Sequence, residues 1–324
     1  MGKRRIRNLQ YLKAGEIFGF DPRPDRRGEA QDRYGIQTFS QIEEAMTVDP
    51  AALIISTPPD LHMKYARLAA LSDKHFFTEA SVVDEGMDEV IALSKGKDFV
   101  AAPSCTMRFH PLVQTIKEIK ESEAIGKVLT FTYHSGQYLP DWHPWEDYRT
   151  FYVAKRETGA CREIVPFELT WLTWVMGSVQ QVSCFKDKLT KLDANIDDAY
   201  HLLLRFQNRA LGHLLVDVIA RAPYRTCRFL GEEGVIEWLW NDKIVRVFSA
   251  REKQWREYRE PEGKVEEGYI HAETMYIREM EQLLKAIRKE QPYPYTFEED
   301  KRVLEVLYAA EKSAVMGKHL RVYS

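Results

Sequence analysis

Residues 49–81 contain two short apolar runs, Ala52-Leu53-Ile54-Ile55-Ser56 and His75-Phe76-Phe77-Thr78. The first run stops at Thr57-Pro58-Pro59, because proline cannot donate a hydrogen bond to a sheet ladder. Asp60 then occupies the position of a helix N-cap, and apolar residues recur at helical spacing behind it. This pattern predicts a strand, a helix and a second strand, with the strands parallel and the crossover right-handed.

Apolar runs without alternation are typical of strands that are buried on both faces of a sheet. In parallel sheets, ligands bind beyond the carboxyl ends of the strands. We therefore expect a ligand site at the residues that follow the two runs. These residues are Thr57, Pro58 and Pro59 after the first run, and Glu79, Ala80 and Ser81 after the second.

The N-terminal segment places an acidic residue at the end of a strand. Residues 2–12 are predicted to form a helix, and residues 16–21 a strand that is closed by Pro22. Asp21 lies 19 positions after Gly2. In a dinucleotide-binding fold, an acid about 20 residues past the glycine loop accepts hydrogen bonds from the adenosine ribose. Gly2 and Asp21 are therefore predicted to bind such a cofactor.

The usual strand and glycine loop before this helix are missing from the sequence, which has no complete G-x-G-x-x-G there. In the strand order 3-2-1-4-5-6 the first strand is central, so its loss leaves two flanking strands with unpaired backbone groups. Two interpretations follow: the true start lies upstream and the sequence is truncated, or the nucleotide-binding half is damaged. We favour the upstream start.

The remaining sequence shows two different patterns of secondary structure. Strands and helices alternate at first, which predicts a doubly wound parallel sheet. From about Gly126 the strands alternate in polarity and follow one another through turns, as in an antiparallel sheet with one open face. We expect a Rossmann-like nucleotide-binding domain at 1–117, without its first strand, and an α+β domain for substrate binding and oligomerisation at 118–324.

The composition limits the classes of partner. A net charge of -3 gives no reason to expect nucleic acid or an anionic membrane surface. The four cysteines show no C-x-x-C pair, which argues against a disulfide framework or a zinc site and favours a reducing, cytoplasmic location. No apolar run approaches the roughly 18 residues of a membrane span.

Several motifs resemble those of the Gfo/Idh/MocA oxidoreductases, a family named after glucose–fructose oxidoreductase and inositol dehydrogenase. Ser56-Thr57-Pro58-Pro59-Asp60-Leu61-His62 is similar to the family's T-P-x-x-x-H turn and is the most specific match. The others are Gly2-Lys3-Arg4-Arg5-Ile6-Arg7-Asn8-Leu9, Phe20-Asp21-Pro22 and Arg108-Phe109-His110-Pro111.

This resemblance implies a Rossmann domain, NAD or NADP as cofactor, and hydride transfer at a carbon of a sugar or cyclitol. Asp21 favours NAD, whereas Arg23, Arg26 and Arg27 would suit the 2′-phosphate of NADP, or simply form a solvated surface. The resemblance also implies a homo-oligomer, a dimer or tetramer, that covers the open sheet face.

Two family motifs that supply proton-handling groups carry apolar residues here, at three positions in all. Ala80 stands where the family's E-K-P motif has its lysine. In the second motif, Ile164 stands at the aspartate and Phe167 at the histidine. Because alanine and phenylalanine cannot exchange protons, the family's usual mechanism cannot use these positions.

Glu163 is our candidate for a replacement acid or base, because it shares a helix face with Phe167. Arg108 or Arg162 would orient the substrate. A surface ion pair is the alternative explanation for Glu163. Among the residues after the strands, Thr57, Pro58 and Glu79 are predicted to line the cofactor.

The segment 136–148 is rich in aromatic residues and carboxylates, which suit the faces and hydroxyls of a sugar. We interpret it as a lid that faces the substrate through Asp141, His143 and Tyr148, and a loop packed on its own domain is the alternative. The histidines lack partners at metal-ligand spacing, so no metal site is predicted.

The sequence thus predicts a nicotinamide-dependent oxidoreductase that acts on a CH–OH group of a sugar, cyclitol or sugar derivative with relocated acid and base groups. A non-enzymatic relative that binds a sugar, a nucleotide or a partner protein is the alternative. A lyase-like reaction through transient oxidation is a third hypothesis. Neither the substrate nor the direction of reaction follows from the residues.

Overall fold

The computed structural model describes residues 1–142, 146–265 and 272–322. The chain forms two compact units, and each unit draws on separate parts of the sequence. Unit 1 comprises Met1–Glu79, Asp84–Ser104 and Tyr276–Glu298. Unit 2 comprises Ala80–Val83, Cys105–Met275 and Glu299–Ser324.

The strands of unit 1 are parallel, as the apolar runs predict. Strand β3 (Ala52–Ile55) pairs with β4 (His75–Thr78), and β4 pairs with β5 (Ala101–Pro103). Helix α4 (His62–Leu71) connects β3 to β4. The predicted strand–helix–strand arrangement is therefore confirmed.

The predicted helix N-cap at Asp60 is wrong. Asp60 lies in a short 3₁₀ turn, η1 (Pro59–Leu61), and α4 begins only at His62 after the N-cap residue Leu61. The proline pair explains the difference, because Pro59 takes the first position of the 3₁₀ turn and delays the α-helix.

A second parallel pair in unit 1 is separate from the first sheet. Strands β1 (Phe18–Phe20) and β2 (Gln37–Phe39) pair only with each other among the described residues. The outer edge of β3 likewise has no strand partner in the described part of the chain. The parallel strands of unit 1 thus form two separate sheets in the described residues.

Helices cover the strands of unit 1 and supply its core. Met280 and Leu283 of α8 (Thr274–Ile287) pack against Phe77 and Ala102, which are far away along the chain. The others, besides α4, are α1 (Gly2–Tyr11), α2 (Pro24–Tyr34), α3 (Ile42–Met46) and α5 (Met87–Ser94).

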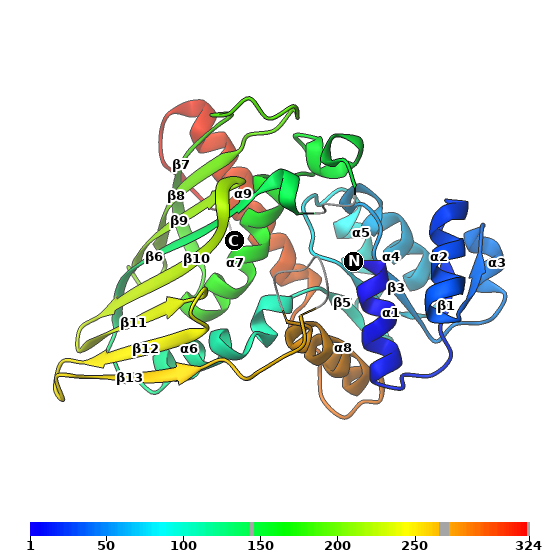
Figure 1. Ribbon diagram of the computed structural model, residues 1–324, viewed down its shortest axis with the longest axis horizontal. Helices are drawn as coiled ribbons and strands as arrows, with labels where there is room; N and C mark the ends of the chain where they lie inside the picture. The colour runs from blue at the N-terminus through cyan, green and yellow to red at the C-terminus, as the bar shows by residue number, and fades with distance from the viewer. Residues whose placement is uncertain (143–145, 266–271, 323–324) are drawn as a thin grey trace. The chain divides into compact units, whose positions relative to one another are not determined.

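Unit 2 contains a large, mostly antiparallel sheet (Figure 1). In the described residues it has nine strands in the order β13-β12-β11-β10-β6-β9-β8-β7-β14, of which only β6 and β9 pair in parallel. The strands are β6 (Val128–Tyr138), β7 (Val179–Asp187), β8 (Ala199–Phe206), β9 (Leu211–Asp217), β10 (Ile219–Gly231), β11 (Gly234–Leu239), β12 (Ile244–Ser249), β13 (Gln254–Arg259) and β14 (Leu320–Arg321).

One face of this sheet is packed and the other is open, as predicted. Trp171 of helix α7 (Cys161–Met176) lies edge-on to Tyr133 and Trp238 on the inner face. Phe185, Leu203 and Tyr224 are exposed on the strands. The remaining long helices are α6 (Pro111–Glu121) and α9 (Phe297–Met316). No helix in the described residues is long and apolar enough to cross a membrane.

Candidate functional site

The candidate acid or base Glu163 lies in the first turn of α7, which follows a constrained backbone turn at Gly159 and Ala160. A Cβ at Gly159 would collide with the backbone carbonyl of Val153, so glycine is required there. Ala160 has φ 53° and ψ -128°, a combination that residues with a side chain rarely adopt. Backbone strain of this kind is common at functional sites, and here it lies three residues before Glu163.

The carboxyl group of Glu163 is shielded from solvent and incompletely satisfied. Its Oε1 accepts a hydrogen bond of 2.9 Å from the hydroxyl of Tyr152, in the 3₁₀ turn η5 (Tyr152–Ala154). Its Oε2 is buried without a hydrogen-bond partner in the described residues. Burial raises the pKa of Glu163 to about 7, although the Tyr152 hydrogen bond acts in the opposite direction. A carboxyl group that titrates near neutral pH can both release and accept a proton.

The raised pKa predicts a pH dependence of stability. From its ordinary value of 4.5 up to about 7, folded Glu163 retains a proton that the unfolded chain has released. Stability therefore falls as pH rises through this range. We expect wild type to lose free energy of unfolding between pH 5 and pH 8 relative to Glu163→Gln, which cannot ionise. Urea unfolding of both proteins at the two pH values measures this, and parallel pH dependences would contradict it.

The two candidate arginines make internal contacts. Arg162 donates to Glu311 through Nε at 2.7 Å, and through Nη1 to the carbonyls of Val82, at 2.8 Å, and Glu157. Arg108 is buried and donates through Nε to the carbonyl of Thr170 at 3.2 Å. These contacts hold both guanidinium groups in fixed positions, and their predicted role in orienting substrate stays a prediction.

The predicted lid residues lie between these two arginines in the sequence, and their environments differ from one another. Asp141 is exposed in the 3₁₀ turn η3 (Leu139–Asp141). Tyr148 is in another such turn, η4 (Tyr148–Thr150), and its hydroxyl accepts a hydrogen bond of 3.3 Å from the backbone of Asp193. His143 lies outside the described residues.

The predicted cofactor residues of unit 1 follow strands β1, β3 and β4. Asp21, after β1, accepts a hydrogen bond of 2.9 Å from the backbone of Arg23 and keeps 31% of its side chain exposed. Thr57 and Pro58 follow β3, and the carbonyl of Thr57 is 2.9 Å from His62 Nε2, which fixes the turn. Gly2 is the first residue of α1.

Glu79, after β4, belongs to a buried ionic cluster that its sequence position does not reveal. Arg5 of α1 donates through Nε and Nη2 to the two oxygens of Glu79, each at 2.8 Å, and through Nη2 to Glu279 of α8 at 2.8 Å. Ser56 adds a hydrogen bond of 2.8 Å to Glu79. Burial alone would raise the pKa of Glu79, but Arg5 outweighs it and keeps this pKa below its usual value.

These environments differ in how well they suit a nicotinamide dinucleotide. The partly exposed carboxylate of Asp21 retains acceptor capacity for ribose hydroxyls. Glu79 already accepts three hydrogen bonds from Arg5 and Ser56. The residues present therefore fit the adenosine ribose at Asp21, whereas Glu79 is better placed to shape the site than to bind directly.

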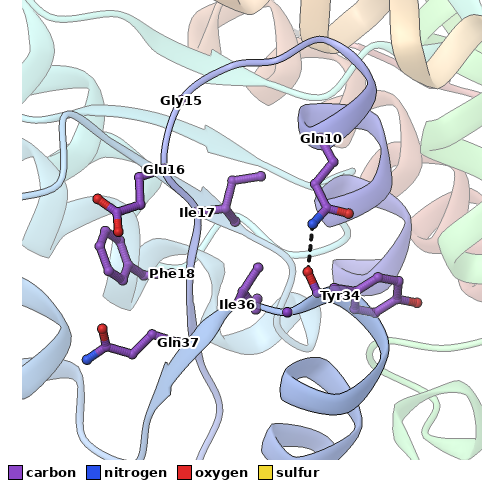
Figure 2. A pocket seen from close by; sticks show the side chains of 9 residues that line it. Gln10, Gly15, Glu16, Ile17, Phe18, Tyr34, Ile36 and Gln37 are labelled. Carbon is purple, nitrogen blue, oxygen red and sulfur yellow. Dashed lines mark hydrogen bonds between the residues drawn. The ribbon is translucent and has the colours of Figure 1, made fainter.

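A cleft of about 230 Å³ lies at the amino ends of β1 and β2, whereas Asp21 follows the carboxyl end of β1 (Figure 2). Gln10, Glu16, Tyr34 and Gln37 are among its lining residues, and Gln10 donates a hydrogen bond of 2.8 Å to the carbonyl of Tyr34. Because ligands of parallel sheets bind at the carboxyl ends of strands, this cleft is not our candidate cofactor site.

Residues 113–237, which include α7 and most of the large sheet, match the family model of the GFO/IDH/MocA C-terminal domain. In this part the chain is similar to the Gfo/Idh/MocA family. A levoglucosan dehydrogenase from Pseudarthrobacter phenanthrenivorans is 24% identical over 73% of this chain and 68% of its own length. A myo-inositol 2-dehydrogenase from Thermotoga maritima is 23% identical over 97% of this chain and 93% of its own length.

Solved structures of Gfo/Idh/MocA type share this fold. A levoglucosan dehydrogenase in complex with NADH superposes with a TM-score of 0.87 at 20% identity, over 100% of this chain and 96% of the other. An oxidoreductase from Agrobacterium radiobacter, in complex with NAD+, L-tartaric acid and magnesium, gives 0.84 at 14% identity, over 98% and 95%. At these identities the likeness establishes the fold alone.

Proposed function

We propose that this protein is a nicotinamide-dependent oxidoreductase of the Gfo/Idh/MocA family that acts on a CH–OH group of a sugar, cyclitol or sugar derivative. The proposal rests on the environment of Glu163. Its carboxyl group is buried, one of its oxygens has no hydrogen-bond partner among the described residues, and its pKa is raised to about 7. It also follows the strained backbone at Ala160. The relatives with levoglucosan and myo-inositol dehydrogenase activity support the substrate class.

In this proposal the chain's own residues bind, orient and handle the proton. Asp21 would hold the adenosine ribose and favours NAD, and the backbone at Thr57 and Pro58 would line the nicotinamide. The bound nicotinamide supplies the acceptor or donor of the hydride. Glu163 takes the hydroxyl proton as the alcohol is oxidised and returns it in the reverse direction, while Tyr152 fixes the carboxyl group.

The substrate side and the assembly extend this proposal. Arg108 and Arg162 would orient the sugar, and the segment with Asp141, His143 and Tyr148 would cover it. We also propose that the open sheet face, with Phe185 and other apolar residues exposed, packs against further copies in a dimer or tetramer.

A second candidate function is a sugar-binding relative without turnover. Ala80 and Phe167 remove the side chains that handle protons in the family. The engagement of Glu79 by Arg5 also takes one predicted cofactor carboxylate out of direct contact. This alternative shares the sugar-binding groups of the first proposal and requires neither nicotinamide binding nor hydride transfer.

Glu163→Gln tests the oxidoreductase proposal. With levoglucosan, myo-inositol and L-sorbose as trial substrates and both nicotinamide cofactors, we expect kcat to fall on the order of a hundredfold, because glutamine cannot exchange a proton. The variant keeps an oxygen for the Tyr152 hydrogen bond, so folding should be retained. Nicotinamide absorbance measures turnover.

Glu118→Gln on α6 is the matched control, because Glu118 is exposed and outside the proposed site. It should keep wild-type turnover. Equal turnover in Glu163→Gln and wild type would remove Glu163 from the mechanism. Absence of any nicotinamide fluorescence change on titration would favour the second candidate function.

A further inference from the structure

We propose that the hydroxyl of Ser81 binds a substrate oxygen beside Glu163, an inference that rests on the oxidoreductase proposal. Ser81 is 4% exposed, and its Oγ has no hydrogen-bond partner among the described residues. A buried hydroxyl without a partner is unfavourable, so native proteins rarely retain one without a reason. A ligand that reaches this oxygen would provide such a reason.

The structure ties Ser81 to the strained start of α7. Ser81 belongs to the short segment Ala80–Val83, which clusters with unit 2 rather than with the strand that precedes it. The carbonyl of Val82, the next residue, accepts the 2.8 Å hydrogen bond from Arg162 Nη1. Arg162 directly precedes Glu163, so one guanidinium group links the two segments that carry the unpartnered oxygens. Glu311 holds this guanidinium from α9 at 2.7 Å.

The two unpartnered oxygens have complementary chemistry. A serine hydroxyl donates one hydrogen bond and accepts others, whereas an ionised carboxylate only accepts. Glu163 Oε2 can therefore take the proton of a substrate hydroxyl, while Ser81 Oγ donates to an oxygen of the same sugar. Ala80 beside it has no polar atom to contribute. Ser81 thus supplies a neutral donor next to the position where family members carry a lysine, and it binds the substrate without exchanging protons.

Ser81→Ala tests this role through binding as well as turnover. We expect the variant to bind levoglucosan, myo-inositol or L-sorbose about tenfold more weakly than wild type, the effect of losing one hydrogen bond in a buried site. The melting temperature without sugar should be equal or slightly higher, because the substitution removes an unsatisfied hydroxyl. Sugar-dependent thermal shifts, recorded with NADH present and absent, measure the affinity.

Ser94→Ala is the matched control, since Ser94 of α5 also has a shielded hydroxyl without a partner but lies outside the proposed site. It should bind sugar like wild type. Equal sugar affinities for Ser81→Ala and wild type would overturn the proposal for Ser81, as would the absence of a shift by any of the three sugars with wild type.

The outcomes separate the two proposals. If wild type binds a sugar without turning it over and Ser81→Ala loses that binding, Ser81 keeps its role and the oxidoreductase function is wrong. If turnover depends on Glu163 but is unchanged in Ser81→Ala, the function stands and the role of Ser81 is wrong.

Discussion

Replacing Arg5 by methionine is expected to lower the free energy of unfolding by about 3–5 kcal/mol. The Arg5 side chain is 2% exposed and lies between Glu79 and Glu279, whose side chains are 11% and 0% exposed. Methionine fills similar volume but leaves both buried carboxylates without the guanidinium group of Arg5. The loss should be larger at pH 8 than at pH 5, because the pKa of Glu79 rises when Arg5 no longer holds it low, and protonation of Glu79 then relieves part of the cost.

Urea unfolding measures this effect, and the midpoint should shift without a large change in slope. Arg33→Met is the matched control, because the Arg33–Glu29 pair is exposed and should contribute less than about 1 kcal/mol. The triple variant Arg5→Met, Glu79→Gln, Glu279→Gln should recover much of the loss, since it removes the uncompensated charges. A loss below about 1 kcal/mol for Arg5→Met alone would show that the cluster is not the buried ionic contact described here.

Replacing Glu168 by leucine is expected to cost a similar amount, about 3–5 kcal/mol, in unit 2. Glu168 is fully buried on α7, and its Oε1 accepts a hydrogen bond of 2.6 Å from Arg225. Its Oε2 accepts from the Tyr133 hydroxyl and the Trp171 indole, each at 2.8 Å. Leucine would remove the carboxylate opposite Arg225 and the acceptor of both aromatic donors, so all three partners would lose a hydrogen bond in the core.

A double-mutant cycle with Arg225→Met isolates the ionic part of this cost. The double variant should be more stable than Glu168→Leu alone, because it no longer buries a guanidinium group without its carboxylate. Glu237→Leu is the control, since Glu237 pairs with the half-exposed Arg228 and Arg246 on the outer face of the sheet. Additive effects of the two core substitutions would contradict the coupling.

The resemblance and the apolar runs predicted the architecture because both depend on local sequence. The run Phe76-Phe77-Thr78 specifies a strand that is buried on both faces, and the change to alternating polarity after Gly126 specifies a sheet with one open face. Local sequence was less informative where proline acts, as at Asp60, which precedes α4 instead of capping it.

Part of the candidate site was also visible in the sequence. Asp21 and Thr57 follow strands, and that position alone makes them candidates in a parallel sheet. Glu163 was selected because it shares a helix face with Phe167. Its orphan oxygen and raised pKa depend on burial and on Tyr152, and neither can be derived from the spacing of residues along α7.

The order of strands and helices, the polarity of each sheet face and the substituted family motifs follow from this sequence alone, because each is encoded within one or a few turns of chain. The ion pairs of Arg5 with Glu279 and of Glu168 with Arg225, and the link from Arg162 to Val82, were decided only by tertiary structure. The partners are 274, 57 and 80 residues apart in the sequence, so their spacing along the chain does not identify them. Which groups pair is decided only when folding buries them together, away from water.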